Sequence, residues 1–179
     1  VPRAPPKNLD PSDNALFEHH YRMLIPGATL QAFGEVVVGP SGTLWRGVRP
    51  SQGLNRTSGQ PLSKLKFAKA IAREWYLGEK VVDAGTWVCD AWSREYFHWL
   101  ADVLPKLILL TGERAILLPP AYTERDYIAQ SLAALNIQHE TISPDHLTRV
   151  RDLCAVSPVA PTGNYNPEAM HRLRIALAP

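Results

Sequence analysis

The sequence is short of cysteine and has no pattern of metal ligands. Only two cysteines, Cys89 and Cys154, occur among 179 residues, and each lies in an apolar stretch. Neither has the spacing to a second cysteine or to a histidine that a zinc site requires. We therefore expect two buried free thiols, with a disulfide between them as the alternative, and neither a metal nor a cofactor. A single pair of cysteines is too few to indicate an oxidising compartment.

An excess of one charge and a long apolar run are also lacking. The chain has 19 Lys and Arg against 17 Asp and Glu, a formal net charge of +2. This balance gives no argument for an anionic membrane or a nucleic acid as partner, and we expect no nucleic acid. The longest apolar stretch, residues 99–118, is interrupted by Asp102, Pro105 and Lys106. We therefore expect no transmembrane segment.

A glycine-rich phosphate loop is the third missing feature, because neither GxGxxG nor GxxxxGK[ST] occurs. The sequence thus lacks the fingerprints for a dinucleotide and for nucleotide phosphates. The length sets a further limit. We expect 179 residues to form one domain, or one lobe of a larger protein, and not a complete two-lobed enzyme.

Proline, by contrast, is in excess, with 16 residues or about 9% against a usual 5% or so. The start of the chain is proline-rich and polar, which predicts an extended arm. Two β-rich runs follow, LQAFGEVVV and GTLWRGVR, on either side of a turn at Gly39-Pro40-Ser41-Gly42. This arrangement predicts a β-hairpin.

An amphipathic helix is predicted from Ser63 to about Gly78. Apolar residues recur there at helical spacing, and basic residues lie on the other faces. The apolar set is Leu65, Ala68, Ile71, Ala72 and Trp75, and the basic set is Lys64, Lys66, Lys69 and Arg73. We interpret the basic face as solvated, with contact to an anionic membrane or polymer as the alternative.

Beyond this helix, predicted strands and helices alternate along the chain. The run GEKVVDAGTWVCDA predicts two short strands divided at Ala84-Gly85, and Ser93 is the expected N-cap of the next helix. Further strands are predicted at residues 114–120, 138–143 and 150–157, and further helices at residues 123–136 and 166–177. This alternation is typical of an α/β fold with a largely parallel sheet.

The helix after Ser93 stands out because apolar residues surround almost all of it, which predicts burial. It nevertheless carries His98 and Asp102, which are neighbours on one face at the i, i+4 spacing. A buried carboxylate needs a partner, and the imidazole one turn away is the nearest. Such a pair can act as a base whose carboxylate orients the ring, and the alternative is that both side chains only cap backbone groups. Pro105 is expected to kink or restart the helix.

The string REYFHWLADVLPKLILL, followed by AILLPP and a helix with LAALNI, resembles glycosyltransferase family 61. The mark of that family is an Asn-Tyr-Tyr/Phe-His-Trp run, then an acidic residue, then Leu-Pro-Arg/Lys-Leu. Glu95 stands here where the family usually has Asn. The matching residues are Tyr96, Phe97, His98, Trp99, Asp102, Leu104, Pro105, Lys106 and Leu107. The resemblance extends loosely from about Phe33 to the end of the chain.

The resemblance implies a transferase that moves a sugar from a nucleotide-sugar donor to a glycan acceptor, as in polysaccharide biosynthesis. Its two Rossmann-like lobes would have the GT-B arrangement. Residues 1–78 would form an N-terminal arm, hairpin and helix, residues 79–179 a Rossmann-like lobe on the acceptor side, and the donor lobe would be missing. The expected compartment is the cytoplasm, or the Golgi lumen for a eukaryotic source. The alternatives are a non-catalytic glycan-binding or assembly module, with a partner chain or as a homo-oligomer, and an inactive fragment of a longer transferase.

The resemblance and the residue pattern give the same candidate site. His98 is the candidate general base or acceptor anchor, and Asp102 is its orienting partner. Trp92 and Tyr96 are candidates for a sugar-stacking platform or for hydrogen bonds to the acceptor.

Three further residues are weaker candidates. Arg94 and Lys106 flank the motif and suit an acidic sugar or a phosphate, with plain surface charge as the alternative. Asp83, at the predicted strand end beside Ala84-Gly85, is a candidate for acceptor contact, because α/β sheets bind ligands at strand ends. The other tryptophans, Trp45, Trp75, Trp87 and Trp99, are interpreted as core.

Overall fold

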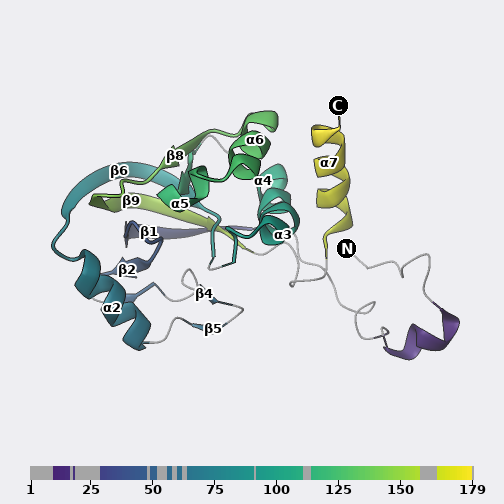
Figure 1. The fold of residues 1–179 in the computed structure, drawn as a ribbon, viewed down its shortest axis with the longest axis horizontal. Coiled ribbons are helices and arrows are strands. Elements are labelled where there is room, and N and C mark those ends of the chain that lie inside the picture. Colours follow the sequence, from purple (N-terminus) through teal and green to yellow (C-terminus); the bar gives the residue numbers. More distant parts are fainter. Residues whose placement is uncertain are drawn as a thin grey trace.

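A computed structural model of the chain describes residues 10–16, 18, 29–47, 49–51, 56–57, 60–61, 64–90, 92–110, 114–157 and 165–178. These residues form an α/β fold, in which one seven-stranded mixed sheet packs against helices (Figure 1). The strands of this sheet are β1 (Leu30–Val38), β2 (Leu44–Arg46), β3 (Arg49–Pro50), β6 (Gly78–Trp87), β7 (Ile116–Leu118), β8 (His139–Thr141) and β9 (His146–Val156). A second, two-stranded sheet consists of β4 (Arg56–Thr57) and β5 (Gln60–Pro61).

The helical segments lie before and between the strands and after the last one. They are η1 (Pro11–Asp13), α2 (Lys64–Glu74), α3 (Tyr96–His98), η2 (Trp99–Val103), α4 (Leu104–Leu109), α5 (Pro120–Thr123), α6 (Asp126–Ala134) and α7 (Pro167–Leu177). Residues 1–9 of the predicted arm lie outside the described residues, and η1, which comes next, buries no side chain. Within the described ranges, none of the helices has the length and apolar character needed to cross a membrane.

The large sheet is parallel in one part and antiparallel in the other. Its strand order is β3-β2-β1-β9-β6-β7-β8. The strands β9, β6, β7 and β8 are parallel to one another, whereas β1 is antiparallel to both β9 and β2. The predicted hairpin is confirmed, since Val38 pairs with Leu44 and Gly39 N donates to Thr43 O at 2.8 Å. The strands before and after residue 78, the predicted boundary between the N-terminal segment and the lobe, therefore belong to one sheet.

The predicted division of residues 78–91 into two strands is wrong. β6 continues through Ala84 and Gly85, and it pairs with β9 from Gly78 to Trp87. Packing explains the glycine, because a Cβ at position 85 would lie only 2.4 Å from Cδ1 of Leu117 in β7. Gly85 thus allows two strands to approach closely, and it does not mark a turn.

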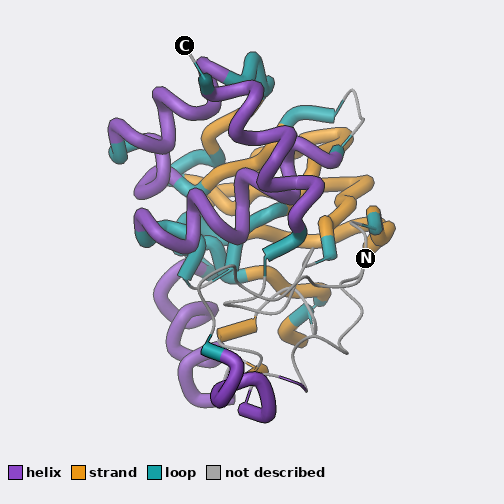
Figure 2. Tube along the Cα trace, turned by 90° about the vertical axis from the view of Figure 1, so that its right-hand side faces the viewer, coloured by secondary structure: helices purple, strands orange, loops and turns teal. Residues whose placement is uncertain are grey.

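Helices cover the two faces of the sheet unequally, and Figure 2 shows most of the helical segments on one side of the strands. On that face, α4, α6 and α7 close a large core, which includes the fully buried Trp99, Leu118 and Leu153. On the other face, α2 contributes to a much smaller cluster, whose buried members are Val37, Trp45 and Phe67. The helix-covered face therefore holds most of the apolar burial that stabilises the fold.

The tryptophans and cysteines follow the expectations with one exception. Trp45, Trp87 and Trp99 are buried, as predicted, and both cysteines are buried free thiols. Trp75, however, is 76% exposed at the end of α2, so its interpretation as core is wrong. The reason is that α2 turns Phe67, and not Trp75, into the small cluster.

Candidate functional site

The helix that carries the family-like motif has three consecutive parts. α3 passes into the π-helical turn η2, and α4 follows directly. Pro105 has no N–H and crowds the carbonyl four residues before it, so an ordinary α-helix cannot run through it unchanged. The wider turn before it closes with a hydrogen bond from Leu104 N to Trp99 O. Pro105 was expected to kink or restart the helix, and the structure shows a change from the π turn to an α-helix that begins at Leu104; turns of this kind occur frequently at functional sites.

His98 and Asp102 lie next to each other across this turn. Nδ1 of His98 is 2.7 Å from Oδ2 of Asp102. The side chains are 25% and 22% exposed, so the pair is open to solvent, whereas the apolar surroundings in the sequence predicted burial. Within the described part of the chain, neither side chain hydrogen-bonds a backbone group, which removes the capping alternative. The carboxylate favours the tautomer with its proton on Nδ1 and a lone pair on Nε2.

Trp99, the residue after His98, anchors the turn from the inside. Its ring is fully buried, and its Nε1 donates to Oγ of Ser131 in α6 at 2.8 Å. The hydroxyl of Ser131 donates in turn to the carbonyl of Ile128 at 3.0 Å. These contacts fix the helix on its buried side, so the position of His98 on its open side is set by the core.

The loop between β6 and α3 is organised by Asp90. Oδ1 of Asp90 accepts hydrogen bonds at 2.9 Å from the backbone N–H groups of Trp92 and Ser93 and from the Ser93 hydroxyl. The prediction of Ser93 as N-cap is therefore wrong: α3 begins at Tyr96, and its N-cap Glu95 makes no side-chain hydrogen bond to the helix. Sequence reasoning missed Asp90, although its spacing to Ser93 is typical of an Asx turn.

Aromatic rings surround the imidazole of His98. The ring centroids of Trp92 and Phe97 lie 5.9 and 5.7 Å from that of His98, and both aromatic side chains are exposed. Phe97 also makes an edge contact with Tyr165, from the segment before α7, at 6.2 Å. Phe97 and Tyr165 were not among the predicted site residues, because their roles depend on a contact between distant segments. Exposed rings beside a polar pair can stack on a sugar.

Tyr96 and Arg94 lie at the edge of this surface. Tyr96 is exposed and makes an edge contact with Tyr127 of α6, with ring centroids 5.1 Å apart. The Tyr127 hydroxyl donates to the carbonyl of Arg94. The guanidinium of Arg94 is exposed and forms no ion pair with any residue that the structure describes, so it is free to meet an anionic group.

The two other weak candidates lie elsewhere. Lys106 is buried, and its Nζ points to the carbonyl of Val88 at 3.5 Å, so the interpretation of Lys106 as a surface charge or a phosphate ligand is wrong. Asp83 lies within β6, and not at a strand end, where it forms an exposed ion pair with Arg151 at 2.8 Å. The structure does not bring Asp83 into the group of rings around His98.

The place of the site in the sheet matches a general rule for α/β proteins. His98 follows the carboxyl end of β6, whose neighbours in the sheet are β9 on one side and β7 on the other. The chain moves from β6 to β7 and β8 in one direction, and β9 lies on the opposite side of β6. Ligands of open α/β sheets bind beyond the carboxyl ends of the strands at such a reversal of strand order.

A cysteine near this end of the sheet is chemically inert. Cys89 follows β6 and is fully enclosed, and burial raises the pKa of its thiol to about 12. Burial likewise raises the pKa of the neighbouring Tyr122 above its ordinary value. Because the thiolate is the reactive form of cysteine, Cys89 is not a nucleophile at neutral pH. His98 and Asp102 therefore remain the candidate reactive groups of this region.

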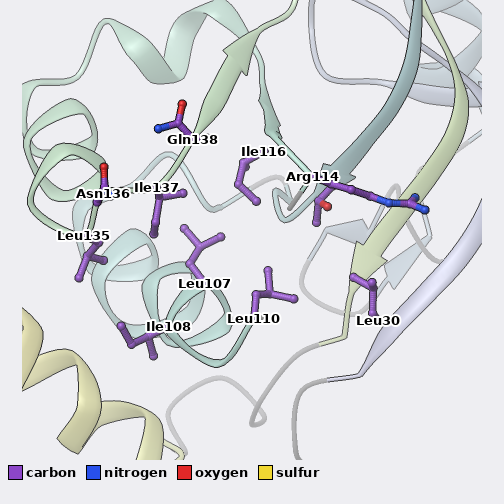
Figure 3. A pocket seen from close by; sticks show the side chains of 11 residues that line it. Leu30, Leu107, Ile108, Leu110, Arg114, Ile116, Leu135, Asn136, Ile137 and Gln138 are labelled. Atoms are coloured by element: carbon purple, nitrogen blue, oxygen red, sulfur yellow. The ribbon is translucent and has the colours of Figure 1, made fainter. Parts of the chain in front are cut away.

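A cavity of about 590 Å³ opens at the amino ends of β7 and β8, beside Thr86 near the carboxyl end of β6. Figure 3 shows Leu107, Leu110 and Ile116 turned toward one space, with the guanidinium of Arg114 extending away. That guanidinium is already paired with Asp152 at 2.7 Å. The cavity is thus mainly apolar, and neither His98 nor Asp102 lines it.

Comparisons of the chain with protein-family models, with curated proteins and with solved structures found no match.

Proposed function

We propose that this chain is the acceptor-side lobe of a glycosyltransferase similar to family 61. The proposal rests on one observation, the 2.7 Å contact between His98 Nδ1 and Asp102 Oδ2 within a surface of exposed aromatic rings. A base for a sugar hydroxyl needs a free ring nitrogen, a carboxylate on the other nitrogen, and an apolar face that holds the sugar. The residues around His98 supply all three.

The proposed reaction assigns a role to each of these groups. An acceptor sugar stacks on Trp92 or Phe97, and one of its hydroxyls donates a hydrogen bond to Nε2 of His98. The hydroxyl oxygen then forms a bond to the anomeric carbon of the donor, while the bond from that carbon to the nucleotide diphosphate breaks. The proton passes to Nε2, and the carboxylate of Asp102 stabilises the imidazolium.

The order of the parallel strands supports a Rossmann-like fold for this lobe. When β6, β7, β8 and β9 are numbered 1 to 4 along the chain, their order in the sheet is 3-2-1-4, the order with which a Rossmann sheet begins. A Rossmann-like acceptor lobe is therefore part of the proposal. A second lobe would bind the nucleotide-sugar donor and stabilise the leaving diphosphate, since the sequence has no phosphate loop for that task.

The exposed rings also favour a second candidate function, a glycan-binding module without catalysis. Stacking on Trp92 and Phe97 requires no base, so this function predicts that Trp92→Ala weakens glycan binding and that His98→Ala leaves it nearly unchanged. Glycan binding with no consumption of any nucleotide sugar by the natural full-length protein would favour this function.

The experiment is a transfer assay with the natural full-length protein, a panel of nucleotide sugars and polysaccharide acceptors. His98→Ala is expected to lower kcat about 10²–10⁴-fold, the usual contribution of a general base. The matched control is His171→Ala, which removes an exposed histidine on α7. A His98→Ala rate within a factor of a few of the wild-type rate would show that His98 is not the base.

A further inference from the structure

The far side of the sheet carries a cluster of cations that the net charge of the chain conceals. They are Lys64, Lys69 and Arg73, and all three lie exposed on α2. Arg46 and Arg49 on β2 and β3 do not add to this cluster, because Trp45 turns toward α2, and Arg46 and its partner Arg49 therefore turn to the other face of the sheet.

Among the described residues, no ion pair neutralises this cluster. Lys64, Lys69 and Arg73 form no ion pair with any residue in the described part of the chain, and Glu35 and Glu79 on the same face pair with Arg149. The single acidic residue of α2, Glu74, is buried and accepts a hydrogen bond from Ser41 N at 3.2 Å. The exposed side of α2 thus carries three cations, and its single carboxylate is turned inward.

An exposed apolar stripe runs beside these cations. Leu65, Ala68, Ala72 and Trp75 follow the i, i+3, i+7, i+10 spacing of one helix face, and all four are exposed. The stripe borders a groove of about 610 Å³, which Trp45 and Leu147 line from the sheet. Trp75 and Tyr76, at the end of α2, are 76% and 75% exposed.

We propose that the exposed side of α2 forms a docking surface for an anionic lipid bilayer. A helix that lies in the membrane interface combines a lysine- and arginine-rich face with tryptophan and leucine on the other face. Trp and Tyr favour the headgroup region, because their rings are apolar with one polar group. An acidic protein is the competing partner, since protein interfaces are also rich in Trp and Tyr; the apolar stripe that runs along α2 between the lysines favours the bilayer.

The surface lies away from the candidate active site. Figure 1 shows α2 below the sheet, on the side opposite α4 and α6, whereas His98 belongs to the helix-covered side. Docking through α2 would leave the His98 surface accessible. The inference is therefore independent of the proposed transferase function, and either can fail without the other.

The experiment measures co-sedimentation of the full chain with vesicles of phosphatidylcholine that contain about one third phosphatidylserine. We expect binding to these vesicles, little binding to pure phosphatidylcholine, and loss of binding as salt rises. The variant Lys69→Glu/Arg73→Glu is expected to weaken binding at least about 25-fold, from about fivefold per cation. Trp75→Ser is expected to weaken it about tenfold.

Matched controls carry the same chemical changes on the helix-covered side. Arg125→Glu/Arg174→Glu alters the net charge equally at the exposed N-cap residue of α6 and at an exposed residue of α7, and Ile175→Ser removes an exposed apolar side chain of α7. Each control is expected to bind within about twofold of wild type. Equal binding to both kinds of vesicle, or controls as weak as the α2 variants, would overturn the proposal. A lipid-free dimer that Trp75→Ser dissociates, with no vesicle binding, would assign the stripe to a second copy.

Discussion

The two faces of the sheet show how one set of strands can serve two purposes. On the helix-covered face, side chains from α4, α6 and α7 leave Leu153 of β9 fully buried. On the opposite face, the same strand places Leu147 at the edge of a small cluster and Arg149 among exposed ion pairs. Burial on one face thus supplies the stability, and the other face is left for charged and partly exposed apolar groups.

This difference explains where the candidate active site lies. Trp99 is fixed in the large core, so the adjacent His98 and its partner Asp102 are held on a rigid support. A catalytic pair needs such support, because small displacements from the productive geometry cost rate. A membrane-docking surface has no comparable requirement, and α2 can present its exposed stripe from a smaller cluster.

The strongest test of the contrast compares two leucines of β9. Leu153→Ala removes a fully buried side chain from the large core and is expected to lower the free energy of unfolding by about 2–5 kcal/mol. Leu147→Ala removes a partly buried side chain from the α2 cluster, and we expect a loss of about 1 kcal/mol or less. Urea unfolding of the two variants measures both values. Equal losses would mean that the α2 side is as closed as the helix-covered side.

Two glycines of β6 give the next largest difference. Gly85→Ala places a Cβ 2.4 Å from Leu117 Cδ1 in the core, so we expect a loss of about 1–3 kcal/mol. Gly78→Ala, at the other end of the strand, places its Cβ 3.1 Å from the exposed ring of His146, which can move aside. Thermal unfolding of Gly78→Ala should therefore stay close to wild type. If both variants lose the same stability, close strand packing is not the reason for Gly85.

A hydrogen bond beneath the candidate site gives a smaller effect. Ser131→Ala removes the acceptor of Trp99 Nε1 and leaves a buried donor unpaired, which is expected to cost about 1–2 kcal/mol. The matched control is Ser143→Ala, which removes an exposed contact with the ring of His146. Chemical denaturation compares the two. A loss no larger than that of the control would show that Trp99 is held by packing alone.

The spacing of apolar residues predicted where helices and strands lie better than it predicted which segments pack against them. The helices α2, α6 and α7 and the strand β7 lie within the residues predicted for them, because apolar spacing is a local property. The contact between His98 and Asp102 was predictable for the same reason, since i, i+4 neighbours meet on any helix. The wider turn at η2 also follows from a local cause, the missing N–H of Pro105.

Features that depend on distant segments were not predictable. Spacing identified Trp75 as part of an apolar face, but only the fold determines which apolar side chains of α2 reach the sheet. Gly85 suggested a turn because the sequence does not reveal that Leu117 fills the space beside it. The contact of Phe97 with Tyr165 joins segments that follow two different strands, so no local pattern indicates it.

The smallest expected effect belongs to the exposed ion pairs of the open face. Arg149 donates from Nε and Nη2 to the two oxygens of Glu79, each at 2.7 Å, and from Nη1 to Glu35 at 2.7 Å. Its hydrogen bonds hold the pKa of the Glu79 carboxyl below the ordinary value of 4.5. All three side chains are substantially exposed, so water screens the pairs, and Arg149→Met is expected to cost less than about 1 kcal/mol.

The pH dependence of this loss tests whether charge causes it. The pKa of Glu79 is lower in the folded chain than its ordinary value of 4.5, so the ion pair stabilises the fold above about pH 4.5. This stabilisation disappears as the pH falls through the pKa that Glu79 has in the folded chain. Urea unfolding of wild type and Arg149→Met should therefore differ near neutral pH and converge in acid. Arg151→Met, which breaks the single hydrogen bond to the more exposed Asp83, should differ less. A difference for Arg149→Met that persists unchanged in acid would mean that the arginine stem packs on this face, and that the face is more apolar than its ion pairs suggest.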